Sequence, residues 1–193
     1  MNHYYDADQT STSEPQDVLV TLDTDTFYVT TDNGVFAKDG LDVATELLIE
    51  SVTPRSSFLD LGCGYGVISV AWLRQHPDAD AVLVDTNKRA LRLARQNLSR
   101  YDLDGDVRQS NGYAGVEESF TDIVSNPPFA AGKDVWTRFV DGAASHLVSG
   151  GRLSMVGRHN KGGRMLSEYM DEVFGTVQTV AKQSGFRVYQ SEL

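Results

Sequence analysis

The alternation of apolar and polar stretches along this chain predicts strands and helices that follow one another in turn. Two β-rich runs, residues 18–22 and 27–30, flank a polar Asp-Thr-Asp segment and predict a hairpin. Asp39 is placed to cap a helix that runs to about Ser51 and carries an apolar face. Pro54 ends that helix, and a different pattern begins after it.

From residue 57 onward, short apolar runs typical of buried strands alternate with amphipathic stretches typical of helices. The predicted strands are residues 58–61, 81–85, 107–110, 122–125 and 153–156. The predicted helices are residues 67–76, 88–101, 134–148 and 164–174. Two further β-rich runs, residues 177–180 and 186–189, close the chain and predict an antiparallel pair.

Strands that alternate with helices imply a mostly parallel sheet that is covered by helices on both faces. We therefore expect an α/β fold with a mostly parallel, seven-stranded sheet, an antiparallel C-terminal strand, and an N-terminal β-hairpin and helix. Residues 1–53 would form an arm, the hairpin and the helix, and these would pack on a core of residues 54–193 within one domain overall.

A glycine-rich loop follows the first strand of the alternating region. Gly62, Gly64 and Gly66 let the backbone approach a ligand closely, while Asp60 and Asp85 stand at the ends of two successive strands. In open α/β sheets ligands bind outside the carboxyl ends of the strands. The third glycine comes one residue earlier than in the dinucleotide fingerprint, and a carboxylate suits a cationic ligand such as S-adenosylmethionine better than a pyrophosphate. The alternative is a tight strand-to-helix turn without a ligand.

The stretch Asn126-Pro127-Pro128-Phe129 follows the strand at residues 122–125. Prolines cannot continue a central strand because they donate no hydrogen bond to the ladder, so a rigid loop must begin there. The Asn126 side-chain oxygen and the Pro127 carbonyl are acceptors for the hydrogens of an amino group, and Phe129 is able to stack on a planar ring. Guanine, adenine and a glutamine amide all present such a group.

These motifs resemble the class I S-adenosylmethionine-dependent methyltransferases. The residues that carry the resemblance are Asp60-Leu-Gly-Cys-Gly-Tyr-Gly, Asp85 and Asn126-Pro-Pro-Phe. The likeness is greatest to the small-domain type, which includes the 16S ribosomal RNA guanine-N2 methyltransferase C and its single-domain archaeal relatives. The segments that extend it over nearly the whole chain are His3-Tyr4-Tyr5 and residues 34–42, 131–134 and 185–189.

The resemblance implies a Rossmann-like class I methyltransferase fold and S-adenosylmethionine as cofactor. It implies that Gly62, Gly64 and Gly66 line the methionine part of the cofactor, that Asp85 holds the ribose, and that Asn111 meets the adenine ring. An Asn-Gly turn is the alternative for Asn111. Bacterial members carry an additional N-terminal half that is absent from this sequence, and we expect that half to be dispensable or replaced by a partner.

The same resemblance implies methyl transfer to an exocyclic amine, and Phe129 favours the 2-amino group of guanine in ribosomal RNA. Methylation of adenine or of a protein glutamine amide stays open, as does a cofactor-binding or RNA-binding module without catalysis. In the mechanism that we expect, Asn126, Pro127 and Phe129 align the acceptor nitrogen, and no metal takes part because the histidines show no ligand spacing with cysteines or carboxylates.

Composition adds limits on location and partners. The chain has 193 residues and one cysteine, Cys63, which excludes an internal disulfide framework. No apolar run approaches the roughly 20 residues that span a membrane, and the N-terminus lacks the features of a signal peptide, so we expect a cytoplasmic protein. The net charge of −10, with 19 Asp against 8 Glu and 5 Lys against 12 Arg, is halophile-like and argues weakly against nonspecific RNA binding.

Two basic stretches interrupt this acidic composition. Arg158, Lys161 and Arg164 follow the strand at residues 153–156, and Lys133 follows Phe129, so these cations would surround the mouth of the site and contact RNA phosphates. A solvated loop is the alternative. We expect a solvated helix face for the other stretch, which contains Lys88, Arg89, Arg92, Arg95 and Arg100. The terminal His3-Tyr4-Tyr5 either folds over the site or is frayed.

Overall fold

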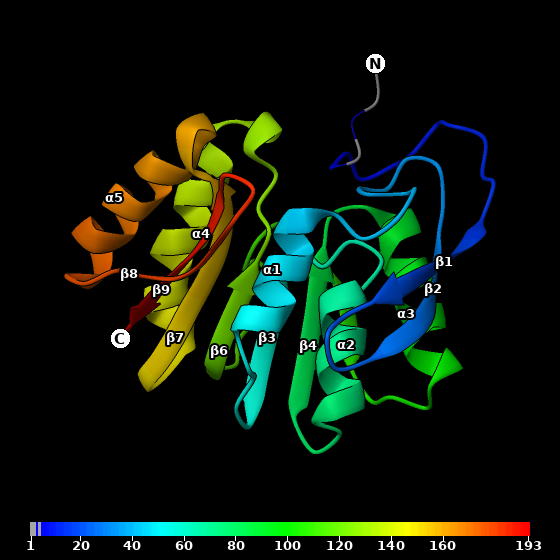
Figure 1. The fold of residues 1–193 in the computed structure, drawn as a ribbon, viewed down its shortest axis with the longest axis horizontal. Helices are drawn as coiled ribbons and strands as arrows, with labels where there is room; N and C mark the ends of the chain where they lie inside the picture. The colour runs from blue at the N-terminus through cyan, green and yellow to red at the C-terminus, as the bar shows by residue number, and fades with distance from the viewer. Residues whose placement is uncertain (1–2, 4) are drawn as a thin grey trace.

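A computed structural model describes residue 3 and residues 5–193, so Tyr4 lies outside the described residues. Its centre is a seven-stranded sheet in the order β5-β4-β3-β6-β7-β9-β8 (Figure 1). The strands are β3 Ser57–Leu61, β4 Asp80–Asp85, β5 Asp106–Gln109, β6 Phe120–Ser125, β7 Leu147–Arg158, β8 Gln178–Gln183 and β9 Phe186–Glu192. Strands β3 to β7 pair in parallel, whereas β9 runs antiparallel to both β7 and β8. The expected α/β fold class is confirmed.

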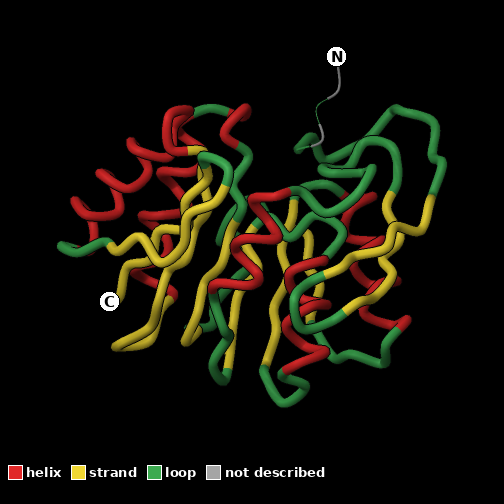
Figure 2. Tube along the Cα trace, viewed as in Figure 1, coloured by secondary structure: helices red, strands yellow, loops and turns green. Residues whose placement is uncertain are grey.

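Helices cover both faces of the sheet (Figure 2). The helices are α1 Val43–Ser51, α2 Val67–Gln75, α3 Lys88–Arg100, α4 Lys133–His146 and α5 Arg164–Phe174. Side chains alternate between the faces along a strand, so Phe58 packs with Trp72 beneath α1, α2 and α3, whereas Leu59 packs with Trp136 beneath α4 and α5. Each face therefore has its own apolar cluster.

The order of the strands reverses between β3 and β6. β3 pairs with β4 on one side and with β6 on the other, and all three run parallel. Their carboxyl ends therefore meet at one edge of the sheet, at the place where α/β sheets of this kind bind ligands.

The predicted N-terminal hairpin is confirmed as β1 Gln16–Thr21 and β2 Thr26–Thr31. It packs on α3 through Asn97, whose Nδ2 donates to the Thr30 carbonyl at 3.0 Å and to the Tyr65 carbonyl at 2.9 Å. The apolar cluster under α1 to α3 also includes hairpin residues. The division of the chain at residue 53 stays a prediction.

The expected solvated face on α3 is confirmed for Lys88, Arg92, Arg95 and Arg100, which are exposed, whereas Arg89 is half-buried. The sequence did not predict that four of these five cations also contact the N-terminal fifth of the chain. Arg100 pairs with Asp17 at 2.9 Å, and Lys88 pairs with Asp8 at the same distance. Arg89 donates to the Asn33 carbonyl at 2.6 Å, and Arg92 lies 4.0 Å from the buried carboxylate of Asp32. These contacts join residues 50 or more positions apart, which a local pattern does not show.

Three predicted boundaries are corrected. α1 begins at Val43 and not after Asp39, because the Asp42 side chain accepts the amide hydrogens of Ala44 and Thr45 and so caps the helix. α4 ends at His146, two residues earlier than expected. β7 begins at Leu147, so the Gly150-Gly151 pair lies inside a long strand instead of preceding it.

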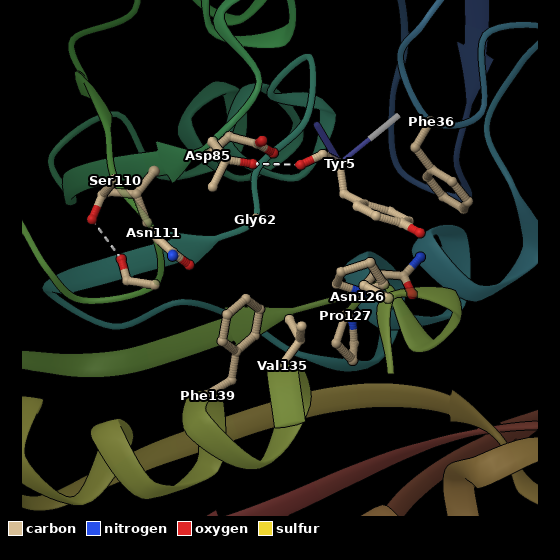
Figure 3. Close-up of a pocket in the computed structure, with 15 residues that line it drawn as sticks. Tyr5, Phe36, Gly62, Asp85, Ser110, Asn111, Asn126, Pro127, Val135 and Phe139 are labelled. Atoms are coloured by element: carbon tan, nitrogen blue, oxygen red, sulfur yellow. Dashed lines mark hydrogen bonds between the residues drawn. The ribbon is translucent and has the colours of Figure 1, made fainter. Parts of the chain in front are cut away.

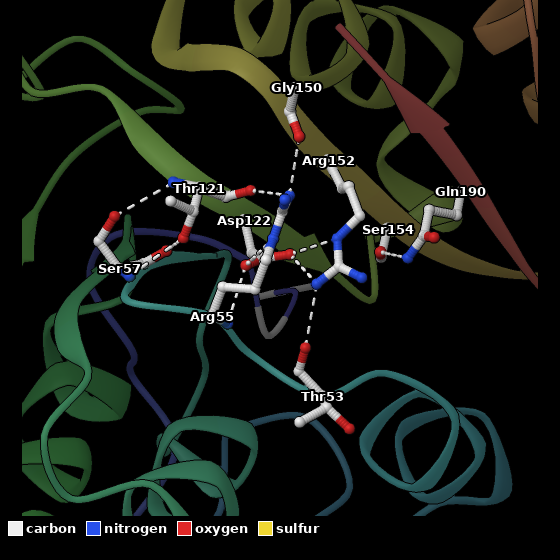
Figure 4. Close-up of polar contacts among 9 residues, drawn as sticks. All are labelled: Thr53, Arg55, Ser57, Thr121, Asp122, Gly150, Arg152, Ser154 and Gln190. Carbon is white, nitrogen blue, oxygen red and sulfur yellow. Dashed lines mark hydrogen bonds and ion pairs between the residues drawn. The ribbon is translucent and has the colours of Figure 1, made fainter.

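A buried carboxylate joins three segments at the end of the sheet opposite the site (Figure 4). Asp122 is 1% exposed, and Arg152 contacts its Oδ1 through Nε at 2.8 Å and Nη2 at 2.5 Å. The backbone amide of Arg55 donates to Oδ2 at 2.9 Å. The Arg55 guanidinium also donates to the carbonyls of Thr121 and Gly150, and the Arg152 guanidinium donates to the carbonyl of Thr53. This cluster fixes the start of β6 against β3 and β7.

A pocket at the carboxyl ends of the central strands

The pocket opens where the strand order reverses, and its two ends differ in character (Figure 3). Gly62, Asp85, Ser110 and Asn111 line one end and come from the carboxyl ends of β3, β4 and β5. Asn126 and two prolines, from the end of β6, line the other. The pocket thus brings together Gly62, Asp85, Asn111, Asn126 and Pro127 of the predicted site residues, and their roles stay a prediction.

Asp85 is fixed by backbone amides. The amide of Gly64 donates to Oδ2 at 2.9 Å, and the amide of Asn87 donates to Oδ1 at 2.8 Å. Burial raises the pKa of Asp85, and these amide hydrogen bonds oppose that rise. Each carboxylate oxygen keeps further acceptor capacity, so the carboxylate is suited to accept two hydroxyl hydrogens from one ligand.

The other two glycines do not line the pocket. Gly64 orients Asp85 through its amide. Gly66, at φ +82°, lies against α3, where a Cβ would stand 3.1 Å from the Cβ of Ala94. In the glycine loop, Gly62 therefore lines the pocket, Gly64 orients a carboxylate, and Gly66 packs against a helix.

Asp60 lies behind the loop, not on the pocket wall. Its side chain is fully buried, Ser69 donates to its Oδ2 at 2.7 Å, and its Oδ1 has no hydrogen-bond partner among the described residues. Burial raises the pKa of Asp60 to about 7. The Asp60 carboxylate is therefore not exposed to the pocket, where we expected it to contact a cationic amine.

At the opposite end, β6 stops at Ser125, as the two prolines predict. Asn126 Nδ2 donates to Thr45 Oγ1 at 2.9 Å, and the Thr45 hydroxyl donates to Asp42 Oδ2. The Pro127 carbonyl accepts the amide hydrogen of Phe129 at 2.9 Å, which leaves it one further lone pair. The carboxamide is thus attached to the first turn of α1.

Phe129 does not face the pocket as its predicted stacking role requires. It begins a short 3₁₀ helix, Phe129–Ala131, and its ring lies 6.2 Å from that of Trp136. Space for the ring is made by Gly157 and Gly162, where added Cβ atoms would stand 2.8 and 2.9 Å from it. The ring supports the loop after β7.

Two other aromatic side chains, Tyr5 and Phe36, line the pocket near Asn126 (Figure 3). Phe36 lies in the segment at residues 34–42, which resembles the family, but the sequence analysis assigned no function to that segment. Tyr5 belongs to the arm, and its carbonyl accepts the Thr86 hydroxyl at 2.8 Å. The Ala7 carbonyl accepts the amide hydrogen of Lys88 at 3.1 Å. The described part of the arm thus lies against the site.

The four predicted RNA contacts lie on exposed parts of the chain. Lys133 begins α4 and lies 6.0 Å from the Trp136 ring centroid. Arg158 ends β7, Lys161 lies in the connection His159–Gly163, and Arg164 begins α5.

Two cations that the sequence reasoning missed, Lys182 and Arg187, extend this group, and both lie near His159. Burial lowers the pKa of His159, and the charges of Arg187, Arg164 and Lys182 lower it further. β9 pairs with β7, so Arg187 comes opposite Gly157, next to Arg158. We call Arg158, Lys161, Arg164, Lys182 and Arg187 the basic edge.

Comparison with known proteins identifies the family. Residues 26–190 match the model of the methyltransferase small domain. The chain belongs to that family. It is 37% identical over 164 residues to ribosomal RNA small subunit methyltransferase C of Escherichia coli (strain SMS-3-5) and, equally, of Escherichia fergusonii. The alignment with each covers 82% of this chain and 47% of the relative.

Solved structures agree with this methyltransferase family. The T. thermophilus 16S rRNA N2 G1207 methyltransferase, in complex with AdoMet and guanosine, superimposes with a TM-score of 0.83 and 26% identity over 92% of this chain and 50% of that one. A methyltransferase from Pyrococcus furiosus has a TM-score of 0.67 at 19% identity, covers 75% of this chain and 79% of its own, and shows the fold alone. The chain spans about half the length of the curated relatives it matches.

Membership in the methyltransferase small domain family confirms the resemblance read from Asp60 to Gly66, Asp85 and Asn126. Residues 3 and 5–193 contain no cluster of side chains that would hold a metal ion. No helix in that part of the chain is long and apolar enough to cross a membrane.

Proposed function

We propose that this chain is an S-adenosylmethionine-dependent methyltransferase that methylates the 2-amino group of guanine in ribosomal RNA. The observation that carries the proposal is that Asp85 and Asn126 line opposite ends of the same pocket. A methyl donor and an acceptor amine need such adjoining subsites, because alignment of the two is the main task of the protein. The named relatives, one with AdoMet and guanosine bound, support the same choice.

The residues present fit the cofactor. Asp85 has acceptor capacity on both oxygens for the ribose hydroxyls, Asn111 offers an amide to the adenine edge, and Gly62 exposes backbone for the methionine part. The bound cofactor supplies a methyl group that is already activated by its sulfonium. The chain's own contribution is to hold the two partners in line and to exclude water.

Acceptor alignment falls to the residues after β6. The lone pair of a base amine is conjugated into the ring, and acceptors aimed at the amine hydrogens release it for attack. The Asn126 oxygen and the Pro127 carbonyl have this role in the proposal. Phe36 and Tyr5, which line the pocket beside Asn126, take the stacking role that the sequence gave to Phe129.

The basic edge supports RNA as the substrate. It concentrates positive charge on an otherwise acidic chain, around the carboxyl end of β7, which lies at the same edge of the sheet as the pocket. Lys133 adds a cation at the start of α4. The cytoplasmic location expected from the sequence is consistent with an rRNA substrate and stays a prediction.

Methyl transfer from tritiated S-adenosylmethionine to ribosomal RNA, compared with transfer to total protein, tests the proposal. We expect label in rRNA and N2-methylguanosine in its digest by mass spectrometry. Methyladenosine or labelled protein would establish one of the alternative acceptors. Cofactor binding without transfer to either would favour a module without catalysis.

Asn126→Ala is the variant that tests alignment. We expect it to reduce turnover about 100-fold or more while the cofactor Kd stays within about twofold, since Asn126 lies at the acceptor end. A matched control is Asn33→Ala, because Asn33 is half-buried like Asn126 but does not line the pocket. Full activity of Asn126→Ala would refute the alignment role.

A further inference from the structure

Asn126 presents one of two chemically opposite ends to the pocket, and the proposed function needs the oxygen. We propose that Thr45 and Asp42 are positioning residues that fix this choice by setting the direction of a chain of hydrogen bonds. The inference rests on the proposed function for its effect on turnover, but the orientation itself is measurable without turnover.

The chain of hydrogen bonds runs from the first turn of α1 to the end of β6. Asn126 Nδ2 lies 2.9 Å from Thr45 Oγ1, and the Thr45 hydroxyl bonds to Asp42 Oδ2. Asp42 Oδ1 separately accepts the amide hydrogens of Ala44 at 3.0 Å and Thr45 at 3.2 Å. Thr45 is 4% exposed, so water has little access to its hydroxyl.

The chemistry of the three groups permits one direction only. An ionised carboxylate accepts hydrogen bonds and cannot donate them, so the single hydroxyl proton of Thr45 must go to Asp42. The Thr45 oxygen then has only lone pairs left for Asn126. Asn126 must therefore turn its NH2 toward Thr45 and its carbonyl oxygen away from it, and Asn126 lines the pocket.

The opposite orientation would be harmful to the proposed reaction. An Asn126 NH2 facing the acceptor amine would set two donors against each other, and the lone pair of the amine would not be released. Capping of α1 requires only Oδ1 of Asp42, because that oxygen takes both backbone amides. The second oxygen of Asp42 is thus available to direct Thr45.

Asp42→Asn should reverse the direction of the hydrogen bonds through Thr45 while it preserves the helix cap, because asparagine caps helices as well as aspartate does. Its Oδ1 keeps the two backbone amides, and its NH2 now donates to Thr45. The Thr45 proton, no longer accepted at residue 42, becomes available to the Asn126 oxygen, which favours the carboxamide with its oxygen toward Thr45 and its NH2 toward the pocket. We expect turnover to fall about 100-fold, with the cofactor Kd and the melting temperature close to wild type.

Variants at Thr45 distinguish the effect of its hydroxyl hydrogen bond from the effect of its side-chain packing. Thr45→Val keeps the branched shape but removes the hydroxyl, so Asn126 samples both orientations. Equal populations of the two would lower turnover about twofold, well short of the loss in Asp42→Asn. Thr45→Ser restores the hydroxyl and should recover most of the turnover. Asp42→Asn combined with Thr45→Val should equal Thr45→Val alone, and therefore exceed Asp42→Asn, because no hydroxyl remains to be inverted. Ser51→Ala, which removes another half-buried hydroxyl from α1, is the matched control.

Nuclear magnetic resonance of the Asn126 side-chain amide gives the second readout. In the wild type we expect contacts between its NH2 protons and the Thr45 methyl, with slow exchange with water. In Asp42→Asn those contacts should be lost and exchange should speed up. A wild type that shows these contacts but methylates nothing would overturn the proposed function alone. Unchanged amide signals in Asp42→Asn, or additive losses in the double variant, would overturn the inference.

Discussion

Replacement of Asp122 tests how the start of β6 is held in the sheet (Figure 4). Asp122→Ala removes a carboxylate that is 1% exposed and that accepts hydrogen bonds from Arg152 at 2.8 and 2.5 Å and from the Arg55 amide at 2.9 Å. The loss leaves the Arg55 and Arg152 guanidinium groups without their carboxylate and the Arg55 backbone amide without its acceptor. Removing one partner of a buried ion pair costs about 3–5 kcal/mol.

The lower end of this range applies here. The side chains of Arg55 and Arg152 are 42% and 23% exposed, so water compensates part of the loss, and both keep backbone carbonyl acceptors. We expect a decrease of about 3 kcal/mol in the free energy of unfolding. For a chain of this length that corresponds to a melting temperature lowered by roughly 6–12 °C. Asp122→Asn, which keeps one acceptor oxygen, should lie between wild type and Asp122→Ala.

Urea unfolding monitored by circular dichroism measures the effect, and the m value should stay unchanged. The matched control is Asp106→Ala, which breaks the surface pair of Asp106 with Arg108 at 2.7 Å. That loss should stay below about 1 kcal/mol because both side chains are solvated. Equal losses for Asp122→Ala and Asp106→Ala would refute the reasoning that burial makes the difference.

Three other predictions follow from the site. The folded-state pKa of Asp60, about 7, lies above its unfolded value near 3.9, so stability present at acid pH is lost as the pH rises between these values. Asp60→Asn should flatten this dependence, which urea midpoints at pH 5 and pH 8 measure. Gly66→Ala should destabilise more than Gly64→Ala, because both have positive φ but only Gly66 contacts α3, and thermal melts compare them. Phe36→Ala should raise KM for RNA at constant cofactor Kd, whereas Phe129→Ala should mainly lower the melting temperature.

The sequence predicted those parts of the fold that local chemistry decides. The end of β6 at Ser125 follows from prolines that cannot join a ladder, and the helix predicted from residue 88 begins at Lys88, where the Asn87 side chain caps it. The start of α1 was missed because Asp39 and Asp42 are both suitable caps. Which of them caps depends on the turn that the chain makes before α1 packs on the sheet, and that is a tertiary property.

The same limit explains what was missed at the site. The pattern placed Asp85 and Asn126 at one edge because parallel strands end together there. It did not reveal that Phe129 turns away, since this depends on space left by Gly157 and Gly162 some thirty residues later. Nor did it reveal the link from Asn126 to Thr45, which spans 81 positions of sequence.

The distribution of ion pairs leaves unpaired positive charge at one edge of an acidic chain. On α3 the cations Lys88, Arg89, Arg92 and Arg100 pair with three carboxylates, those of Asp8, Asp17 and Asp32, so most of their charge is compensated within the fold. Arg158 and Lys161, in contrast, form no ion pair with any described residue. Because screening limits the range of surface charges to about 10 Å, the local field at the basic edge depends on these cations more than on the net charge of −10. The acidic composition therefore does not argue against RNA at this edge.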